Sequence, residues 1–108
     1  MNIIFGVKYA LNVEKAREQI MDFIEKNTTI NYKDKHNETI LYALVYRAYY
    51  CLHFRGYEYY IMWLDLIKEV YEWTSKYYRD MRSTKTKKTA KEFAIELGMH
   101  KIVEIMEE

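Results

Sequence analysis

Apolar residues recur along most of this chain at steps of three and four, the spacing of one face of an α-helix. The first such region covers residues 3–26 and is interrupted near Asn12. Its apolar face is made by Ala16, Ile20, Phe23 and Ile24. Residues 27–38 are rich in Asn, Asp and Thr, which predicts that the helix ends at 27–29 and a loop or hairpin follows.

The next region, residues 39–54, is almost wholly apolar or aromatic and is interrupted chiefly by Arg47 and His53. This pattern predicts a helix that is packed on most sides. Gly56 separates it from residues 57–78, where apolar steps of three or four predict one long amphipathic helix.

A polar connection covers residues 80–88, and two short helices separated by Gly98 are predicted after it. The chain contains no Pro and only three Gly, and alternating strand-like patterns are scarce. These features favour long, rarely broken helices. The sequence therefore predicts a single all-α domain of helical hairpins.

The order of signals around residues 34–42 resembles an ankyrin repeat, a unit of about 33 residues. In that family a turn ending in Asp-x-x-Gly-x-Thr-Pro-Leu-His leads into a short helix, a Gly and a longer helix. Here the matching segment is Asp34-Lys35-His36-Asn37-Glu38-Thr39-Ile40-Leu41-Tyr42. Asn37 stands in the place of Gly, Ile40 in that of Pro and Tyr42 in that of His. Upstream, Ile30-Asn31 occupies the family's Val-Asn pair and Asn27 the place of its helix-terminating Gly.

Length departs from the family pattern. Thr39 and Thr89 are equivalent in this alignment and lie 50 residues apart, so the middle repeat is longer than a standard one by about 17 residues. Thr39 and Gly56 are 17 residues apart, whereas Thr89 and Gly98 are 9 apart. About 8 of the extra residues are therefore expected to lengthen the first helix of the middle pair by roughly two turns. The resemblance implies stacked antiparallel hairpins, ankyrin-repeat-like with elongated middle helices, with repeats at about 1–33, 34–83 and 84–108. An unrelated helical bundle is the alternative.

The resemblance also implies a function. In ankyrin proteins the turns project as fingers, which line a concave binding face together with the first helices. The first finger here is residues 32–36 and the second finger is residues 82–88. The partner-binding residues predicted in this way are Tyr32, Lys33, Lys35, His36, Arg82, Lys85, Lys87 and Lys88. We expect the basic second finger to meet an acidic surface of a protein partner; a solvated turn without a partner is the alternative.

Aromatic residues suggest a second candidate surface. The chain has twelve Tyr and two Trp, and adjacent pairs such as Tyr49-Tyr50 cannot both point inward from a helix. Exposed Tyr and Trp are frequent interface anchors. We therefore expect contact with a protein partner or a homo-oligomer formed through the middle helices. Short, divergent ankyrin chains of this kind resemble viral or symbiont effectors that bind a host protein.

Charge and cysteine content narrow the classes of partner. With 17 basic and 16 acidic residues the net charge is +1, and the basic stretch 76–91 adjoins an acidic stretch, 92–108, that opposes binding to nucleic acid. No apolar run approaches the roughly 20 residues of a membrane span. A lone Cys51 cannot form an intramolecular disulfide, and no secretory signal is evident. The expected location is cytoplasmic, in the cell that makes the protein or in a host cell.

Signals for catalysis are few. The histidines lie in separate segments, and the glycines are isolated, so neither a metal site nor a phosphate loop is predicted, and no cofactor is expected. One alternative is an enzyme: Arg47 and His53 have the Arg-x5-His spacing that resembles the motif of HEPN ribonucleases. There the Arg would hold a phosphate while the imidazole moves protons. On a regular helix these two side chains lie about 240° apart, so the main prediction is a non-enzymatic protein.

Overall fold

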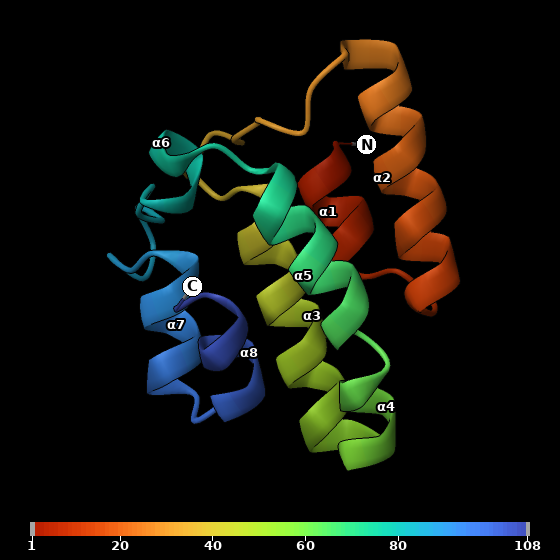
Figure 1. Ribbon diagram of the computed structural model, residues 1–108, viewed down its shortest axis with the longest axis vertical. Helices are drawn as coiled ribbons and strands as arrows, with labels where there is room; N and C mark the ends of the chain where they lie inside the picture. Colours follow the sequence, from red (N-terminus) through yellow and green to blue (C-terminus); the bar gives the residue numbers. More distant parts are fainter. Residues whose placement is uncertain (1, 108) are drawn as a thin grey trace.

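The computed structural model describes residues 2–107, and every regular element within them is an α-helix (Figure 1). The predicted all-α fold is confirmed. The helices are α1 (Ile3–Lys8), α2 (Val13–Asn27), α3 (Ile40–Phe54), α4 (Tyr57–Ile61), α5 (Leu64–Trp73), α6 (Lys76–Arg79), α7 (Ala90–Glu96) and α8 (His100–Ile105).

The interruption near Asn12 is confirmed and has a local cause. The Asn12 side chain accepts a hydrogen bond from the backbone N–H of Lys15 at 2.8 Å, so it is the N-cap of α2. At the other end of α2 the left-handed residue is Thr28, with φ of 60°. The alignment had placed the helix-terminating residue at Asn27, one position earlier. Asn27 is instead the last helical residue, since its backbone still follows the helix.

α3 begins at the N-cap Thr39, whose hydroxyl accepts the backbone N–H of Tyr42 at 3.1 Å. Residues 40–45 are all buried, as the apolar run predicts. The last turns are different, because Tyr50 is 43% exposed and Phe54 is 70% exposed. The helix is therefore packed on most sides only over its first half.

The prediction of one long helix over residues 57–78 is wrong: this segment forms α4, α5 and α6. At the first break the N–H of Trp63 donates to the carbonyl of Tyr60, three residues back, at 3.1 Å. Both rings are buried. The Trp63 ring lies near the Arg47 guanidinium of α3.

The second break has side-chain causes. The hydroxyl of Thr74 donates to the carbonyl of Val70 at 2.6 Å, and its backbone is extended. The N–H of Ser75 donates to the Asn31 side chain at 3.0 Å. In a continuous helix that N–H would bond to the carbonyl of Tyr71. A residue 44 positions away in sequence therefore ends α5, which helical periodicity does not reveal.

The helices form two layers. In the first layer α3 packs against α1 on one side and α7 on the other. In the second layer α2 packs against α1, α5 against α3 and α8 against α7, and α5 also packs against α8. Figure 1 shows α3 and α5 between the pair α1–α2 and the pair α7–α8. Arg17 of α2 and Glu69 of α5 form an ion pair that joins the second layer. The segments on either side of Gly56 thus fold back on each other, as expected.

The lengths of the first-layer helices agree with the expected extension. α3 has 15 residues and α7 has 7, a difference of 15 − 7 = 8 residues, or about two turns. The second helices also differ, since α5 has 10 residues and α8 has 6, and further extra residues of the middle segment form the separate short helices α4 and α6. Both helices of the middle hairpin are therefore longer than their counterparts in the closing hairpin, although the second is not one continuous helix.

The connection between α2 and α3 closes with a compact turn. The Asp34 carboxylate accepts the backbone N–H groups of His36 and Glu38, each at 2.9 Å. Asn37 follows with φ of 60°. This left-handed position is the one that the family motif fills with Gly, and Asn is among the residues that tolerate it best. The turn then leads directly into the N-cap Thr39.

The connection before α7 uses the same device with different residues. The hydroxyl of Ser83 accepts the N–H of Lys85 at 3.1 Å, and Lys87 has φ of 64°. The N-cap Thr89 follows two residues later, and with Glu92 it forms a capping box. The two connections therefore share a side chain that accepts a backbone N–H and a left-handed residue before an N-cap Thr, although the second is one residue longer between these features.

Glu38 links both connections to α1. Its side chain is 3% exposed and forms an ion pair with Lys8 Nζ at 2.5 Å. Its second oxygen accepts the Ser83 hydroxyl at 2.8 Å. The backbone adds a further link, because the N–H of Thr84 donates to the carbonyl of His36 at 2.8 Å. α1, the first finger and the second finger are thus held together by one buried group and one backbone bond.

We expect Glu38→Ala to lower the free energy of unfolding by about 2–3 kcal/mol, since it removes the partner of Lys8 and of Ser83. Urea denaturation followed by circular dichroism measures the change. The control is Glu25→Ala on the exposed side of α2, where a change within about 0.5 kcal/mol is expected. Equal effects of the two substitutions would contradict this role of Glu38.

A second prediction concerns the left-handed turn positions. Lys87→Gly is expected to raise the free energy of unfolding by about 0.5–1 kcal/mol, because Gly adopts positive φ without steric strain. Asn37→Gly should raise it less. Lys85→Gly is the matched control, since Lys85 is not among the residues with positive φ; it is expected to lower stability by about 0.5 kcal/mol. Thermal unfolding of the three variants tests the order, which a destabilising Lys87→Gly would overturn.

Candidate functional site

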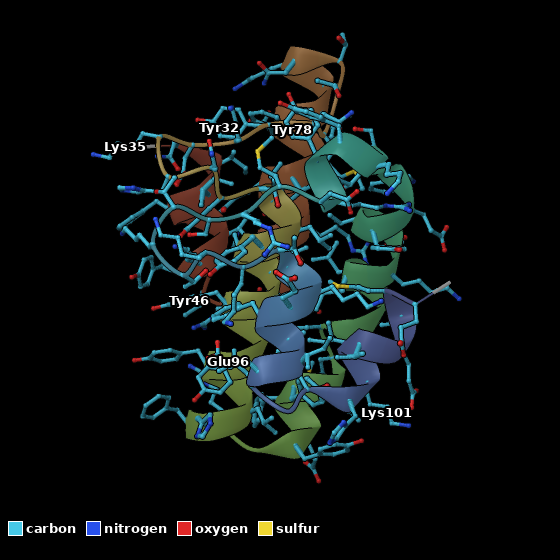
Figure 2. All side chains as sticks on the ribbon, turned by 90° about the vertical axis from the view of Figure 1, so that its left-hand side faces the viewer. Tyr32, Lys35, Tyr46, Tyr78, Glu96 and Lys101 are labelled. Carbon is cyan, nitrogen blue, oxygen red and sulfur yellow. The ribbon has the colours of Figure 1, made fainter. Side chains whose placement is uncertain are left out.

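The two fingers lie side by side through the bond from Thr84 to His36. Each carries exposed lysines that make no ion pair within residues 2–107; these are Lys33, Lys35, Lys85 and Lys87. In Figure 2 Lys35 points away from the body of the protein. Lys35 and Lys85 line one groove beside α1, whereas Lys33 lines a separate hollow together with Lys76 and Asp80 of α6 and its end.

Two other predicted cations have partners inside the protein. Arg82 binds both carboxylate oxygens of Glu92, and its Nη1 also donates to the carbonyl of Lys87 at 3.0 Å. Lys88 Nζ lies 4.0 Å from Glu96. These side chains shape the second finger and fix it to α7, so they are less available for a partner than the four unpaired lysines.

Glu92 shows the electrostatic effect of this arrangement. The backbone N–H of Thr89 holds the pKa of Glu92 below its ordinary value of 4.5, and the Arg82 guanidinium lowers it further. Both groups favour the charged form of the carboxyl. The capping box at the start of α7 and the position of the second finger therefore depend on the same ionised side chain.

The remaining predicted residues, Tyr32 and His36, are half-buried. The Tyr32 ring packs edge-on against Phe23 of α2, with ring centroids 5.3 Å apart. Both Tyr32 and His36 line a groove of about 530 Å³ that α1 and the first finger form together. They are thus walls of a groove rather than projecting contacts.

An exposed row of aromatic rings runs from α1 to the end of α3. We define this aromatic ladder as Phe5, Tyr9, Tyr46, Tyr50 and Phe54. Successive centroids are 4.7, 6.3, 6.4 and 4.5 Å apart. Within each helix its members recur every four residues, a signal that the sequence contains. The step from Tyr9 to Tyr46 depends on the packing of α1 on α3, so the sequence alone does not join the two halves.

Cations lie against the aromatic ladder. Lys8 Nζ is 5.0 Å from the centre of the Tyr46 ring, and the Arg47 guanidinium is 5.9 Å from the Tyr50 ring. Both distances fall within the range of cation–π attraction. In Figure 2 Tyr46 lies on the same side of the molecule as Lys35. The ladder and the first finger therefore belong to one face.

Tyr42, which stands in the place of the family's His, joins the middle of this face to α7. Its hydroxyl hydrogen-bonds with the Thr86 hydroxyl of the second finger at 2.8 Å. Its ring stacks on Phe93 at 4.8 Å with an interplanar angle of 8°. Burial raises the pKa of the Tyr42 hydroxyl, so it stays protonated at neutral pH. Tyr42 thus holds the second finger in place and is itself 3% exposed.

The residues of the ribonuclease-like spacing have separate surroundings. Arg47 lies near the rings of Tyr50 and Trp63, whereas the His53 ring packs against Tyr49 at 4.3 Å. No hydrogen bond between Arg47 and His53 occurs in the described part of the chain, and the Nε of Arg47 is buried without a partner there. The geometry therefore gives no support to a shared phosphate site at these two residues.

Over residues 2–107 no group of three or more His, Cys, Asp and Glu side chains is placed to hold a metal ion. In the same range no helix is long and apolar enough to cross a membrane. Cys51 is a buried free thiol in α3.

Comparisons with known proteins add no relative. No family model matches the chain, and no curated protein and no solved structure matches it.

We expect the pKa of the Glu92 carboxyl to lie below 4.5. Arg82→Ala should raise this pKa but leave it below 4.5, because the backbone N–H of Thr89 still donates to the carboxylate. Since the pKa is lowered in the folded state, Glu92 contributes to stability above its unfolded-state pKa, and this contribution is lost as pH falls through the folded-state pKa. NMR titration of the Glu92 side chain measures both values. A pKa unchanged by Arg82→Ala would show that the ion pair is not formed in solution.

Proposed function

We propose that this chain is a non-enzymatic scaffold for protein–protein contact and a degenerate member of the ankyrin-repeat class. The matched turns before α3 and α7 support this proposal, since both place a left-handed residue two positions before an N-cap Thr. The two-layer order of the hairpins supports it as well. In such a scaffold the first-layer helices and the fingers form the binding face.

One observation carries the proposal: part of the aromatic ladder and two of the unpaired finger lysines line the same groove. Phe5 and Tyr9 of the ladder line the same groove as Lys35 and Lys85. Aromatic side chains bring large contact area with few rotatable bonds, which is why they are frequent anchors of binding energy. Exposed cations steer the encounter and select the orientation of the partner. A face that combines both is suited to a protein ligand.

The sign of the charge defines the kind of partner. Lys33, Lys35, Lys85 and Lys87 present positive charge that no acidic group of residues 2–107 neutralises within 4.0 Å. The partner is therefore a protein with an acidic surface. Lys68 and Lys101, by contrast, are exposed on helices α5 and α8 of the second layer.

The test is affinity capture from the cells that make the protein, followed by mass spectrometry. We expect the double variant Lys35→Glu/Lys85→Glu to recover a specific partner at about one tenth of the wild-type level or less, because charge reversal repels an acidic surface. The matched control is Lys68→Glu/Lys101→Glu, which makes the same change in net charge on the other layer. Figure 2 shows Lys35 and Lys101 on opposite sides of the molecule.

Equal loss of the partner in both double variants would mean that net charge, and not this face, governs capture. Retention of every captured protein by the Lys35→Glu/Lys85→Glu variant would contradict the proposed binding face. Circular dichroism of the variants shows that a loss of capture does not come from unfolding.

A further inference from the structure

The groove between α1 and the fingers has two walls of different origin. Phe5 and Tyr9 come from successive turns of α1, and His36 comes from the first finger opposite them. Lys85 of the second finger also reaches the groove. The volume of about 530 Å³ is in the range of ligand-binding pockets, about 300–1,000 Å³. It is large enough for a few side chains of a ligand.

The acidic side chains that line the groove, Asp34 and Glu38, are hydrogen-bonded within the protein. Asp34 accepts two backbone N–H groups of its own turn. Glu38 is bound by Lys8 and by the Ser83 hydroxyl. These carboxylates therefore have their partners, and the charge that remains free for a ligand is positive.

The three lysines that line the groove differ in whether they have an acidic partner within the described residues. Lys8 has Glu38 as its partner and also lies over the Tyr46 ring. Lys35 and Lys85 are exposed and make no ion pair among the described residues. The bond from Thr84 to His36 keeps the two fingers, and hence these two lysines, next to each other. The groove thus has one wall with two free positive charges.

The opposite wall is apolar and open to solvent. Phe5 is 52% exposed and Tyr9 is 57% exposed, and their ring centroids are 4.7 Å apart. When an apolar side chain of a ligand covers these two rings, the burial of apolar surface stabilises the complex by about 25 cal/mol per Å². The aromatic ladder continues this apolar surface from Tyr9 toward α3.

We propose that the groove binds an acidic linear segment of a protein partner, with one large apolar side chain of the segment packed on Phe5 and Tyr9. Carboxylates on the same segment meet Lys35 and Lys85. This inference rests on the proposed function and specifies its ligand. A segment is favoured over nucleic acid because Lys35 and Lys85 are the only lysines or arginines among the described lining residues of the groove that lack an ion pair, whereas a phosphate chain with a charge on every unit is bound by several cations.

The probe is a random library of 12-residue peptides displayed on phage and selected on the full chain. We expect the enriched sequences to combine several Asp or Glu with one Trp, Phe or Leu. The enriched peptide is then labelled with fluorescein, and fluorescence anisotropy measures its dissociation constant. Matched peptides with Gly in place of the apolar residue, or with Asn and Gln in place of the acids, should each bind at least about tenfold more weakly.

Variants locate the site. Lys35→Glu/Lys85→Glu and Phe5→Ser should each weaken the enriched peptide by about tenfold or more. The controls are Lys68→Glu/Lys101→Glu and Tyr59→Ser; Tyr59 is 47% exposed on α4, outside the groove. Both controls should stay within about twofold of wild type. Thermal unfolding of each variant excludes loss of the fold as the cause.

The groove proposal is overturned if no sequence is enriched, if the enriched peptides lack acids or lack the apolar residue, or if the groove variants bind like the controls. Displacement of the labelled peptide by a single-stranded RNA of the same length at equal concentration would also overturn it in favour of a nucleic-acid site. If the peptide experiments fail while Lys35→Glu/Lys85→Glu still abolishes protein capture, the partner presents a folded acidic surface, and the proposed function stands without the linear segment.

Discussion

The positions of α1 and the two fingers relative to one another depend on the buried carboxylate of Glu38. An ionised group that is nearly excluded from water must have partners of opposite charge or hydrogen-bond donors. Lys8 of α1 and Ser83 before α7 supply them. Because these partners come from segments far apart in the sequence, satisfying one side chain fixes how α1 and the two fingers meet. The neutralisation of Lys8 also leaves Lys35 and Lys85 as the free charges of the groove.

The extension of α3 explains why so much aromatic surface is exposed. α3 is 15 residues long and α7 only 7, so the last turns of α3 pass beyond the neighbour that covers its first half. Tyr42 lies in the covered half and stacks on Phe93. Tyr50 and Phe54 lie beyond it and remain open to solvent. The last turns of α3 thus leave aromatic surface exposed to solvent.

The two connections show that turn geometry is more faithfully repeated than turn sequence. Asp34 and Ser83 differ in charge, yet each side chain accepts a backbone N–H two residues later. Asn37 and Lys87 differ in their tolerance of positive φ, yet both adopt it. Several residue types therefore meet the geometric requirements of these turns.

The sequence by itself determined the helical class, the start of α2 at Asn12, the start of α3 at Thr39 and the extension of α3. These features depend on local periodicity and on side chains that cap their own backbone, so neighbouring residues contain the information. The exposed finger lysines were also found from the sequence, since a run of polar and basic residues is seldom buried.

Only the tertiary structure decided the rest. The break after α5 requires Asn31, which lies 44 residues from Ser75. The pairing of Arg82 with Glu92 gives one predicted contact residue a partner inside the protein, and the packing of α1 on α3 joins the two halves of the aromatic ladder. Each of these three contacts joins residues that are distant in sequence or requires one side-chain rotamer among several. The periodicity of apolar residues does not predict such contacts, because they form only when the helices pack and buried polar groups are hydrogen-bonded.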